Sequence, residues 1–112
     1  MSMVYEPRRG DLYIAELEPP FGQRPCIVIS NDTGNHFSDN VIVVPITSRK
    51  KKQLPTHVWI TSKTGLRIPG TALCEHILTI PKFNLVKFIG NVHGLKEEKR
   101  LNAAIKVSID LM

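Results

Sequence analysis

The residues best suited to chemistry stand where two apolar runs begin and end. Arg24 comes directly before Pro25 and an apolar run. Thr47, followed by Ser48, closes a second apolar run that begins at Val41. A guanidinium offers a rigid fork to two oxygens of a phosphate and keeps its charge at ordinary pH. A hydroxyl gives up its proton only with help, so Thr47 is suited to orienting a group by a hydrogen bond. The pair could therefore hold and stabilise an anionic group.

Both residues also have ordinary structural interpretations. A surface arginine can fix a turn, and threonine is common in strands because its branched side chain packs well on a sheet. A guanidinium holds its proton tightly, so charge stabilisation rather than proton donation is the chemical role expected of Arg24. Strand ends that are backed by a packed core are stiff, and a site needs that stiffness. The chemical interpretation thus depends on whether Arg24 and Thr47 lie together.

A carboxylate and an imidazole are neighbours at Glu75 and His76, within a run predicted as a strand. Two such groups can share acid and base duties. Neighbours on a strand point to opposite faces, so the two side chains are not expected to touch. Glu75 is a candidate base or groove wall, and His76 is a further candidate for the same site. For His57, a structural hydrogen bond and a chemical role both remain open.

The charge balance favours a polyanionic partner. The 112 residues hold fifteen Lys and Arg against ten Asp and Glu, a formal net charge of +5. A basic surface raises the encounter rate with nucleic acid and with an acidic protein alike. A protein that is merely basic is the plain alternative. With 42% hydrophobic residues, the chain is long enough for one core and too short for two, so residues 1–112 are expected to form a single domain.

The two cysteines, Cys26 and Cys74, lie far apart inside apolar runs and form no C-x-x-C motif. They are expected to be reduced core residues of a cytoplasmic protein. No His and Cys spacing resembles a zinc site and no phosphate-binding glycine motif is present, so neither a metal nor a cofactor is predicted. No apolar stretch approaches the roughly 18 residues of a membrane-spanning helix, so no membrane association is expected.

Apolar runs separated by turn-forming residues predict about six strands. Their expected ranges are 12–17, 25–30, 41–46, 56–61, 70–80 and 85–92. The second and third are expected to pair, across turn formers at 31–35. Residues 41–46 are apolar at every position, which fits a strand buried on both faces. Pro45 within this strand predicts a bulge or a free edge, because proline has no N–H for the ladder.

After Leu95 the period of the sequence changes to that of a helix. Apolar residues recur at i, i+3, i+4 and i+8 from Leu101, and the opposite side is charged and expected to face solvent. The predicted packing face comprises Leu101, Ala104, Ile105, Ser108, Ile109 and Met112, and the predicted exposed side Lys96, Glu97, Lys99, Arg100 and Lys106. Strands followed by one helix, without βαβ alternation, predict a mostly β, antiparallel barrel covered by a C-terminal helix.

Several separated segments together resemble the MazF/PemK toxin family. The segments agree in order and spacing and extend over nearly the whole chain, which makes the resemblance more specific than any one short motif. The matching segments are Arg9–Tyr13, Arg24–Pro25, Asn31–Ser38, Val41–Thr47, Leu54–Val58, and Glu75 with Thr79–Ile80.

The resemblance implies an SH3-like barrel of the CcdB/PemK type, with about six antiparallel strands and a C-terminal α-helix. It also implies a homodimer and a ribosome-independent endoribonuclease that cuts single-stranded mRNA at selected sequences without a metal. A small acidic antitoxin would neutralise such a toxin. The catalytic arginine and threonine of the family correspond to Arg24 and Thr47.

With RNA as the substrate, further residues become candidates for the same site. RNA carries its own nucleophile in the 2′-hydroxyl, so cleavage needs only a proton acceptor, a proton donor and a cation beside the phosphate. The candidate catalytic or groove residues are Glu75, Ser48 and His76. The candidate RNA-binding residues are Phe21, Gln23, Arg49, Lys50, Lys51 and Lys52. The basic run could follow the phosphates or be a solvated loop, and Phe21 could stack on a base or plug the barrel mouth.

The chain departs from the family pattern just before Arg24. Relatives carry a longer, Gly-rich loop there, where this sequence keeps only residues 19–23. The glutamine that follows the strand-five acid in the family is His76 here. Two alternatives therefore stay open. One is a barrel that binds RNA or an acidic protein without cutting it, and the other is a CcdB-like topoisomerase poison.

Overall fold

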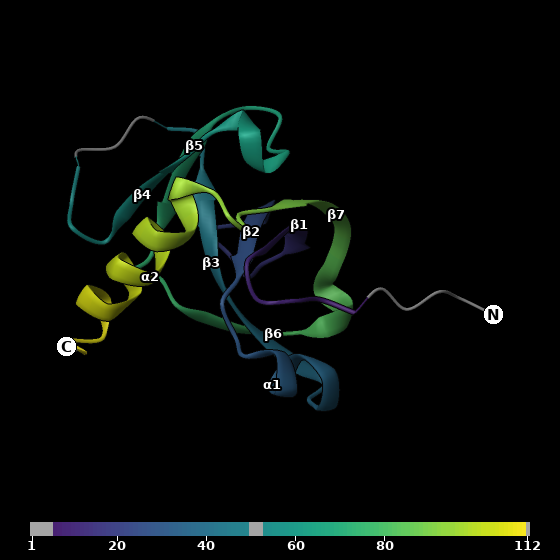
Figure 1. The fold of residues 1–112 in the computed structure, drawn as a ribbon. Coiled ribbons are helices and arrows are strands. Elements are labelled where there is room, and N and C mark those ends of the chain that lie inside the picture. The colour runs from purple at the N-terminus through teal and green to yellow at the C-terminus, as the bar shows by residue number, and fades with distance from the viewer. Residues whose placement is uncertain (1–5, 50–52, 112) are drawn as a thin grey trace.

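An antiparallel sheet with one long helix packed against it makes up the protein (Figure 1). The computed structural model describes residues 6–49 and 53–111. The strands are β1 (Asp11–Glu16), β2 (Gln23–Val28), β3 (Asn40–Thr47), β4 (His57–Ile60), β5 (Gly70–Leu73), β6 (Leu78–Pro81) and β7 (Leu85–Asn91). The α-helices are α1 (Asp32–Phe37) and α2 (Lys96–Ser108), and two single 3-10 turns are η1 (Ser62–Thr64) and η2 (Lys82–Asn84).

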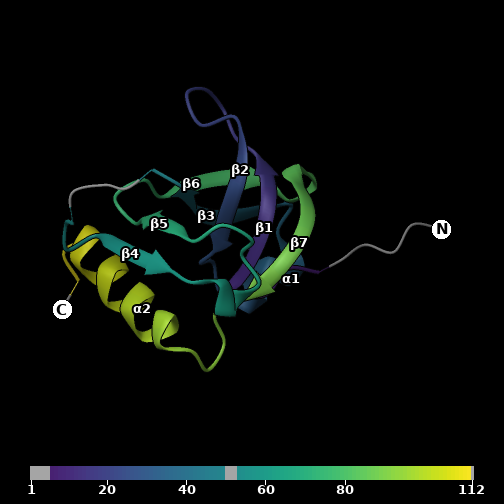
Figure 2. The ribbon, with the colours of Figure 1, turned by 90° about the horizontal axis from the view of Figure 1, so that it is seen from above.

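The strand order explains the curved shape of the sheet (Figure 2). Neighbouring strands run β4-β5-β3-β2-β1-β7, and β6 also pairs with β3. Every pairing between described strands is antiparallel. Strands β4 and β7 end the hydrogen-bonded path, so the sheet curves without closing on itself. The mostly β, antiparallel fold with a C-terminal helix is confirmed, and its described residues contain seven strands instead of about six.

Strand β3 lies at the centre and changes partners along one edge. Its first half pairs with β6, from Asn40 to Val43, and its last two residues pair with β5. Pro45 lies between the part of β3 that pairs with β6 and the part that pairs with β5. Its missing N–H therefore removes no hydrogen bond from either ladder. The prediction of one strand over residues 70–80 is therefore wrong. Residues 74–77 leave the ladder opposite this proline, with His76 N donating to Leu73 O at 3.0 Å.

The expected pairing of the second and third strands is confirmed. Cys26 faces Pro45 and Val28 faces Val43 in an antiparallel register. Strand β2 covers residues 23–28 rather than 25–30, because the backbone N–H groups of residues 29 and 30 both donate to one acceptor, Ile42 O. The chain then enters α1, which the turn formers at 31–35 did not predict. Asn31 caps this short helix, its Oδ1 accepting from Gly34 N at 2.7 Å.

Two apolar clusters cover the two faces of the sheet, and both draw on the same strands. One includes Leu12, Ile27 and Val44 together with residues of β4 and α2. The other includes Tyr13, Cys26 and Val43, each one position away from a member of the first. This alternation is the period of two expected of a strand with both faces buried. Burial raises the pKa of the Cys26 thiol to about 12, which agrees with an inert core residue.

Helix α2 packs against β4 through Leu101 and Ala104, which are buried in the first cluster. The helix ends at Ser108, and Ile109 beyond it is exposed, so the predicted packing face is shorter than expected. Met112 lies outside the described residues. Glu97, predicted on the exposed side, is buried. Its Oε2 accepts hydrogen bonds from both Thr61 N, at 3.1 Å, and Thr61 Oγ1, so the carboxylate ties α2 to the end of β4.

The segment that carries η1 lies directly on the backbone of β7, at two glycines. A Cβ built on Gly90 would lie 1.8 Å from Thr64 O, and one built on Gly65 would lie 2.6 Å from Ile89 O. Gly65 also has a φ of +100°, which side chains rarely adopt. Only glycine allows the two backbones to approach this closely. The contact fixes the position of the segment that follows η1.

Gly90→Ala should destabilise the fold, because its Cβ would push η1 away from β7. Overpacking of this kind costs about 1–3 kcal/mol. The matched control is Gly34→Ala within α1, whose Cβ would meet nothing closer than 3.4 Å. That variant should be as stable as the wild type or more stable, by up to about 1 kcal/mol. Urea unfolding curves measure both, and equal stability of Gly90→Ala and the wild type would contradict the close contact.

Candidate active site

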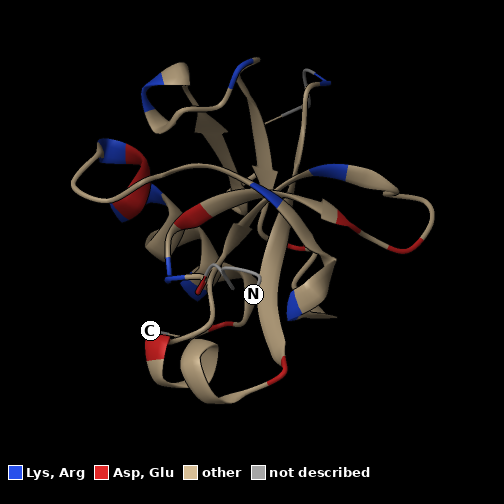
Figure 3. Cartoon of the chain, turned by 90° about the vertical axis from the view of Figure 1, so that its right-hand side faces the viewer, with Lys and Arg blue, Asp and Glu red and all other residues tan. Residues whose placement is uncertain are grey.

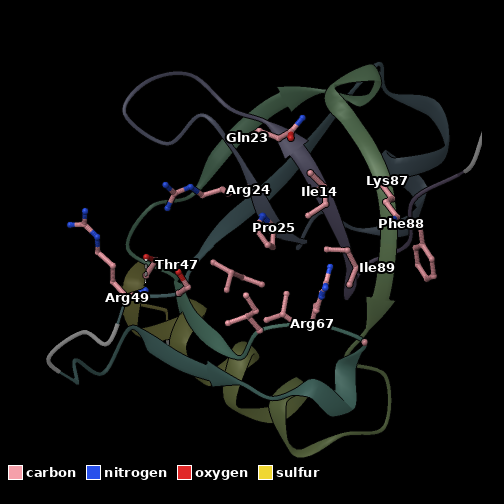
Figure 4. Close-up of a pocket in the computed structure, with 15 residues that line it drawn as sticks. Ile14, Gln23, Arg24, Pro25, Thr47, Arg49, Arg67, Lys87, Phe88 and Ile89 are labelled. Atoms are coloured by element: carbon pink, nitrogen blue, oxygen red, sulfur yellow. Dashed lines mark hydrogen bonds between the residues drawn. The ribbon is translucent and has the colours of Figure 1, made fainter.

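A groove of about 670 Å³ opens at the ends of β2 and β3 (Figure 4). Its walls come from five parts of the chain: β1, the start of β2, the end of β3 with the residues after it, the segment after η1, and β7. The lining residues are Ile14, Gln23, Arg24, Pro25, Ile46, Thr47, Ser48, Arg49, Gly65, Leu66, Arg67, Ile68, Lys87, Phe88 and Ile89. The structure therefore brings Arg24 and Thr47 to one cavity.

The groove is cationic. Four of its described lining residues are Lys or Arg, namely Arg24, Arg49, Arg67 and Lys87, and none is acidic. Elsewhere the charges are mixed, and on the side of the molecule shown in Figure 3 acidic residues stand among the basic ones. A hollow lined by one sign of charge with apolar walls focuses the electric field on its interior. The lining thus favours an anionic ligand.

Register places Arg24 and Thr47 opposite each other. Cys26 faces Pro45 in the β2–β3 ladder, and each candidate lies two positions further toward the same end of the sheet. Side chains two residues apart on a strand share a face. Arg24 and Thr47 therefore continue the row of Cys26 and Pro45 at the edge of the groove, one from each of two neighbouring strands.

The Thr47 hydroxyl is already engaged in a way that directs its proton. Thr47 is only 7% exposed, and its Oγ1 accepts a hydrogen bond from Arg49 N at 3.2 Å. With one lone pair used by the backbone, the O–H remains available as a donor. Ser48 and Arg49 are exposed at the same rim. The arrangement suits a hydroxyl that donates to a phosphate oxygen.

The Arg24 guanidinium is held by the loop that precedes it. Its Nε donates to Phe21 O at 2.8 Å, and its Cζ lies 5.4 Å from the centre of the Phe21 ring. Phe21 itself is not among the residues that line the groove. Gln23 does line it, and its Nε2 donates to Glu16 Oε1 at 2.6 Å. Lys50, Lys51 and Lys52 lie outside the described residues.

Glu75 and His76 do not line the groove. They occupy the turn between β5 and β6 and contact different neighbours. Glu75 Oε2 lies 2.8 Å from His57 Nε2, and its Oε1 accepts from Thr56 Oγ1 at 3.0 Å. The His76 ring meets the Phe21 ring edge-on, with centroids 5.2 Å apart. His57 thus has the structural hydrogen bond that the sequence left open.

The far wall of the groove was not predicted. Arg67 and Ile68 come from the segment after η1, and Lys87 and Phe88 from β7. Lys87 interrupts an apolar strand, which was the available signal. Its place in the same groove as Arg24 could not be read from the sequence, because it depends on β7 pairing with β1 and on the glycine contact between η1 and β7.

Within residues 6–49 and 53–111, no group of three or more His, Cys, Asp or Glu side chains is arranged to hold a metal ion. In the same part of the chain, no helix is long and apolar enough to cross a membrane.

The fold is a curved antiparallel sheet with a cationic groove at its strand ends. These features place the protein among small β proteins that can bind a polyanion. Residues 8–109 match the family described as PemK-like, MazF-like toxin of type II toxin-antitoxin system. The chain is 41% identical to endoribonuclease MazF of Staphylococcus saprophyticus over 111 residues, which span 93% of this chain and 92% of the relative. It is 38% identical to endoribonuclease EndoA of Bacillus subtilis over 112 residues, spanning 94% and 96%.

Solved structures share this fold. The toxin MazF-mt6 of Mycobacterium tuberculosis has a TM-score of 0.80 at 29% identity, with 91% of this chain and 98% of that chain covered. An endoribonuclease from a mycobacterial species, solved in complex with its cognate antitoxin, has a TM-score of 0.82 at 24% identity, with 95% and 97% covered. The chain therefore belongs to the family of PemK-like, MazF-like toxins, and the resemblance seen in the sequence is confirmed.

The carboxylate of Glu75 should make the stability of the fold depend on pH. Burial alone would raise the pKa of Glu75, but the hydrogen bonds from His57 and Thr56 outweigh it and lower this pKa below its ordinary value. Since the unfolded value is about 4.3, the stabilisation is present above about pH 4.3 and is lost as the pH falls through the folded-state pKa.

Melting temperatures of the wild type and Glu75→Gln should therefore converge as the pH is lowered from about 7 to about 3. Glu18→Gln, which removes an exposed carboxylate from the β1–β2 loop, is the matched control and should follow the wild-type profile. A constant difference between Glu75→Gln and the wild type over this range would show that the ionised carboxylate is not what stabilises the turn.

Proposed function

We propose that this chain is an endoribonuclease toxin that cuts single-stranded mRNA in the groove at the ends of β2 and β3. The observation that carries the proposal is the meeting of Arg24 and Thr47 in a cavity whose described lining is cationic and contains no acid. The two curated relatives, both named as endoribonucleases and aligned over more than nine-tenths of this chain, support the same activity. Residues 1–112 form the single toxin domain.

The chemistry uses the nucleophile that RNA itself supplies. The 2′-oxygen forms a bond to the adjacent phosphorus while the bond to the 5′-oxygen breaks. The proton lost by the 2′-hydroxyl is balanced by the one that the departing 5′-oxygen takes up. The products are a 2′,3′-cyclic phosphate and a 5′-hydroxyl, and no metal is needed to generate the nucleophile.

Arg24 and Thr47 act on the phosphate between these two oxygens. The guanidinium stabilises the negative charge that builds up on the phosphate oxygens in the transition state. The Thr47 O–H orients the same group by a hydrogen bond, since its oxygen is held by Arg49 N. Both side chains project from strand ends, so little motion is needed to assemble the site.

The far wall supplies contacts to the rest of the strand. Lys87 and Arg67 follow the phosphates, and Phe88, which is 37% exposed at the outer edge of the groove (Figure 4), gives a base a surface on which to stack. Such stacking contributes about 1–3 kcal/mol per base. Arg49, exposed at the rim, adds a further cation for the backbone of the nucleic acid.

A small acidic antitoxin is the proposed protein partner. The net charge of +5 and the four cations of the groove favour an acidic segment, which would block RNA by occupying the same cavity. The mycobacterial relative solved with its antitoxin supports this assignment. We further propose that the toxin is a cytoplasmic homodimer. Exposed Trp59 and Val107, which line a hollow between β4 and α2, give a dimer an apolar surface to cover.

Cleavage should depend on Arg24 and persist in EDTA. A single-stranded transcript incubated with the wild type should give fragments with 5′-hydroxyl and cyclic-phosphate ends. Arg24→Ala should lower kcat by about 10²–10³-fold, because it removes the cation that stabilises the transition state. Arg8→Ala, which deletes an exposed arginine outside the groove lining and changes the net charge equally, should cut as the wild type does.

Intact RNA at high concentrations of wild-type protein would refute the proposed reaction. Tight, salt-sensitive RNA binding without turnover would then indicate the non-cleaving barrel. Growth arrest with cleaved gyrase–DNA complexes and stable mRNA would indicate the topoisomerase poison.

Binding should lose part of its salt dependence when Lys87 is removed. For single strands, each phosphate contact contributes about 0.7 to the slope of log Kd against log salt concentration. Lys87→Ala should reduce that slope by about this amount. A 2′-O-methyl oligonucleotide, which lacks the nucleophile, allows the measurement by fluorescence anisotropy. Lys99→Ala on α2 is the control and should leave the slope unchanged, whereas an unchanged slope for Lys87→Ala would place the strand elsewhere.

A further inference from the structure

We propose that Phe21 and His76 are positioning residues for Arg24, although neither lines the groove. The proposal rests on the proposed function in so far as it concerns catalysis. Its structural part, that these two rings hold the guanidinium in one orientation, stands on contacts in the free protein. Phe21 touches Arg24 on one side and His76 on the other.

The first contact decides which edge of the guanidinium remains for a ligand. Arg24 Nε donates to Phe21 O at 2.8 Å. A guanidinium has five N–H groups in a fixed plane, so a carbonyl at Nε uses one edge and leaves the terminal Nη pair. That pair is a fork suited to two phosphate oxygens. The Phe21 carbonyl thus selects the orientation in which the fork is available.

The second contact holds the charge over an aromatic face. The Cζ atom of Arg24 lies 5.4 Å from the centre of the Phe21 ring, inside the roughly 6 Å over which a cation and a ring attract. One residue therefore holds Arg24 through both its carbonyl and its ring. The position of the guanidinium depends on the position of Phe21.

Phe21 is in turn fixed at both of its ends. The short β1–β2 loop closes with Leu17 N donating to Gly22 O at 3.0 Å, and Phe21 N donates to Glu18 O at the same distance. The ring packs against the apolar cluster that contains Leu17 and Cys26. The short loop is therefore an ordered support that presents the arginine.

His76 connects this support to the turn between β5 and β6. Its ring meets that of Phe21 at 68°, with 5.2 Å between centroids. It comes from the turn between β5 and β6, where its own N–H is fixed to Leu73 O. Edge-to-face pairs of this geometry are favourable. The loop before Arg24 and the turn after β5 thus meet through two rings, and His76 acts on the groove through Phe21.

The test compares His76→Ala with His76→Phe, which keeps a ring for the contact. His76→Ala should lower kcat at least about tenfold with a smaller effect on KM, because a displaced guanidinium stabilises the transition state poorly. His76→Phe should restore most of the activity, which loss of a titratable group would not allow. Phe83→Ala, which deletes an aromatic side chain that is 84% exposed in η2, is the matched control and should cut normally.

A double-mutant cycle gives a second test of the positioning role. In the Arg24→Ala background, His76→Ala should cause no further loss, because the residue through which it acts is gone. Full activity of His76→Ala, failure of His76→Phe to restore it, or an additive loss in the Arg24→Ala background would each overturn the positioning role.

One measurement separates this inference from the proposed reaction. In the free protein, hydrogen exchange of the Arg24 Nε–H, followed by NMR, should be slow because of its bond to Phe21 O. His76→Ala and Phe21→Ala should each speed that exchange, and Phe83→Ala should not. Unchanged exchange in His76→Ala would overturn the inference whether or not the protein cuts RNA. If RNA stays intact while the exchange behaves as expected, the proposed reaction fails and the positioning contact stands.

Discussion

The rest of the structure depends on the hydrogen-bonded ladder between β2 and β3. Both strands are buried on two faces, so a shift of one residue would move apolar side chains from one cluster to the other. The register in which Cys26 faces Pro45 is therefore strongly specified. Arg24 and Thr47 follow in that register at one end. Their juxtaposition is a consequence of core packing further along the same strands.

Much of this arrangement could be predicted because it is local. The two apolar runs, their pairing and the candidates at their ends follow from the alternation and the turn formers of residues 24–48. The break within residues 70–80 was not predicted. It lies opposite Pro45, which belongs to another strand, so no local pattern indicates it. Glu97 was assigned to the wrong side because its partner, Thr61, lies at the end of β4.

For the candidate site, too, some residues could be predicted from the sequence and others could not. Residues 23–25 and 47–49 were expected to gather at one place, and they do. Arg67, Lys87 and Phe88 join them only through long-range pairing, which no local pattern contains. Glu75 and His76 were drawn toward the site by their chemistry, but their turn directs one to His57 and the other to Phe21. Residue type indicated reactivity, and only the fold could indicate what each group faces.

The contact of η1 with β7 allows the lining side chains of the groove to change without a change in the backbone that carries them. The spacing there is set by two backbones touching at Gly65 and Gly90, and no lining side chain takes part in it. The frame of the cavity is thus independent of the side chains that a ligand meets. Exchanging Arg67 or Ile68 would alter the surface that the groove offers to a ligand, while the segment after η1 keeps its place on β7. The lining can therefore change while the backbone scaffold stays as it is.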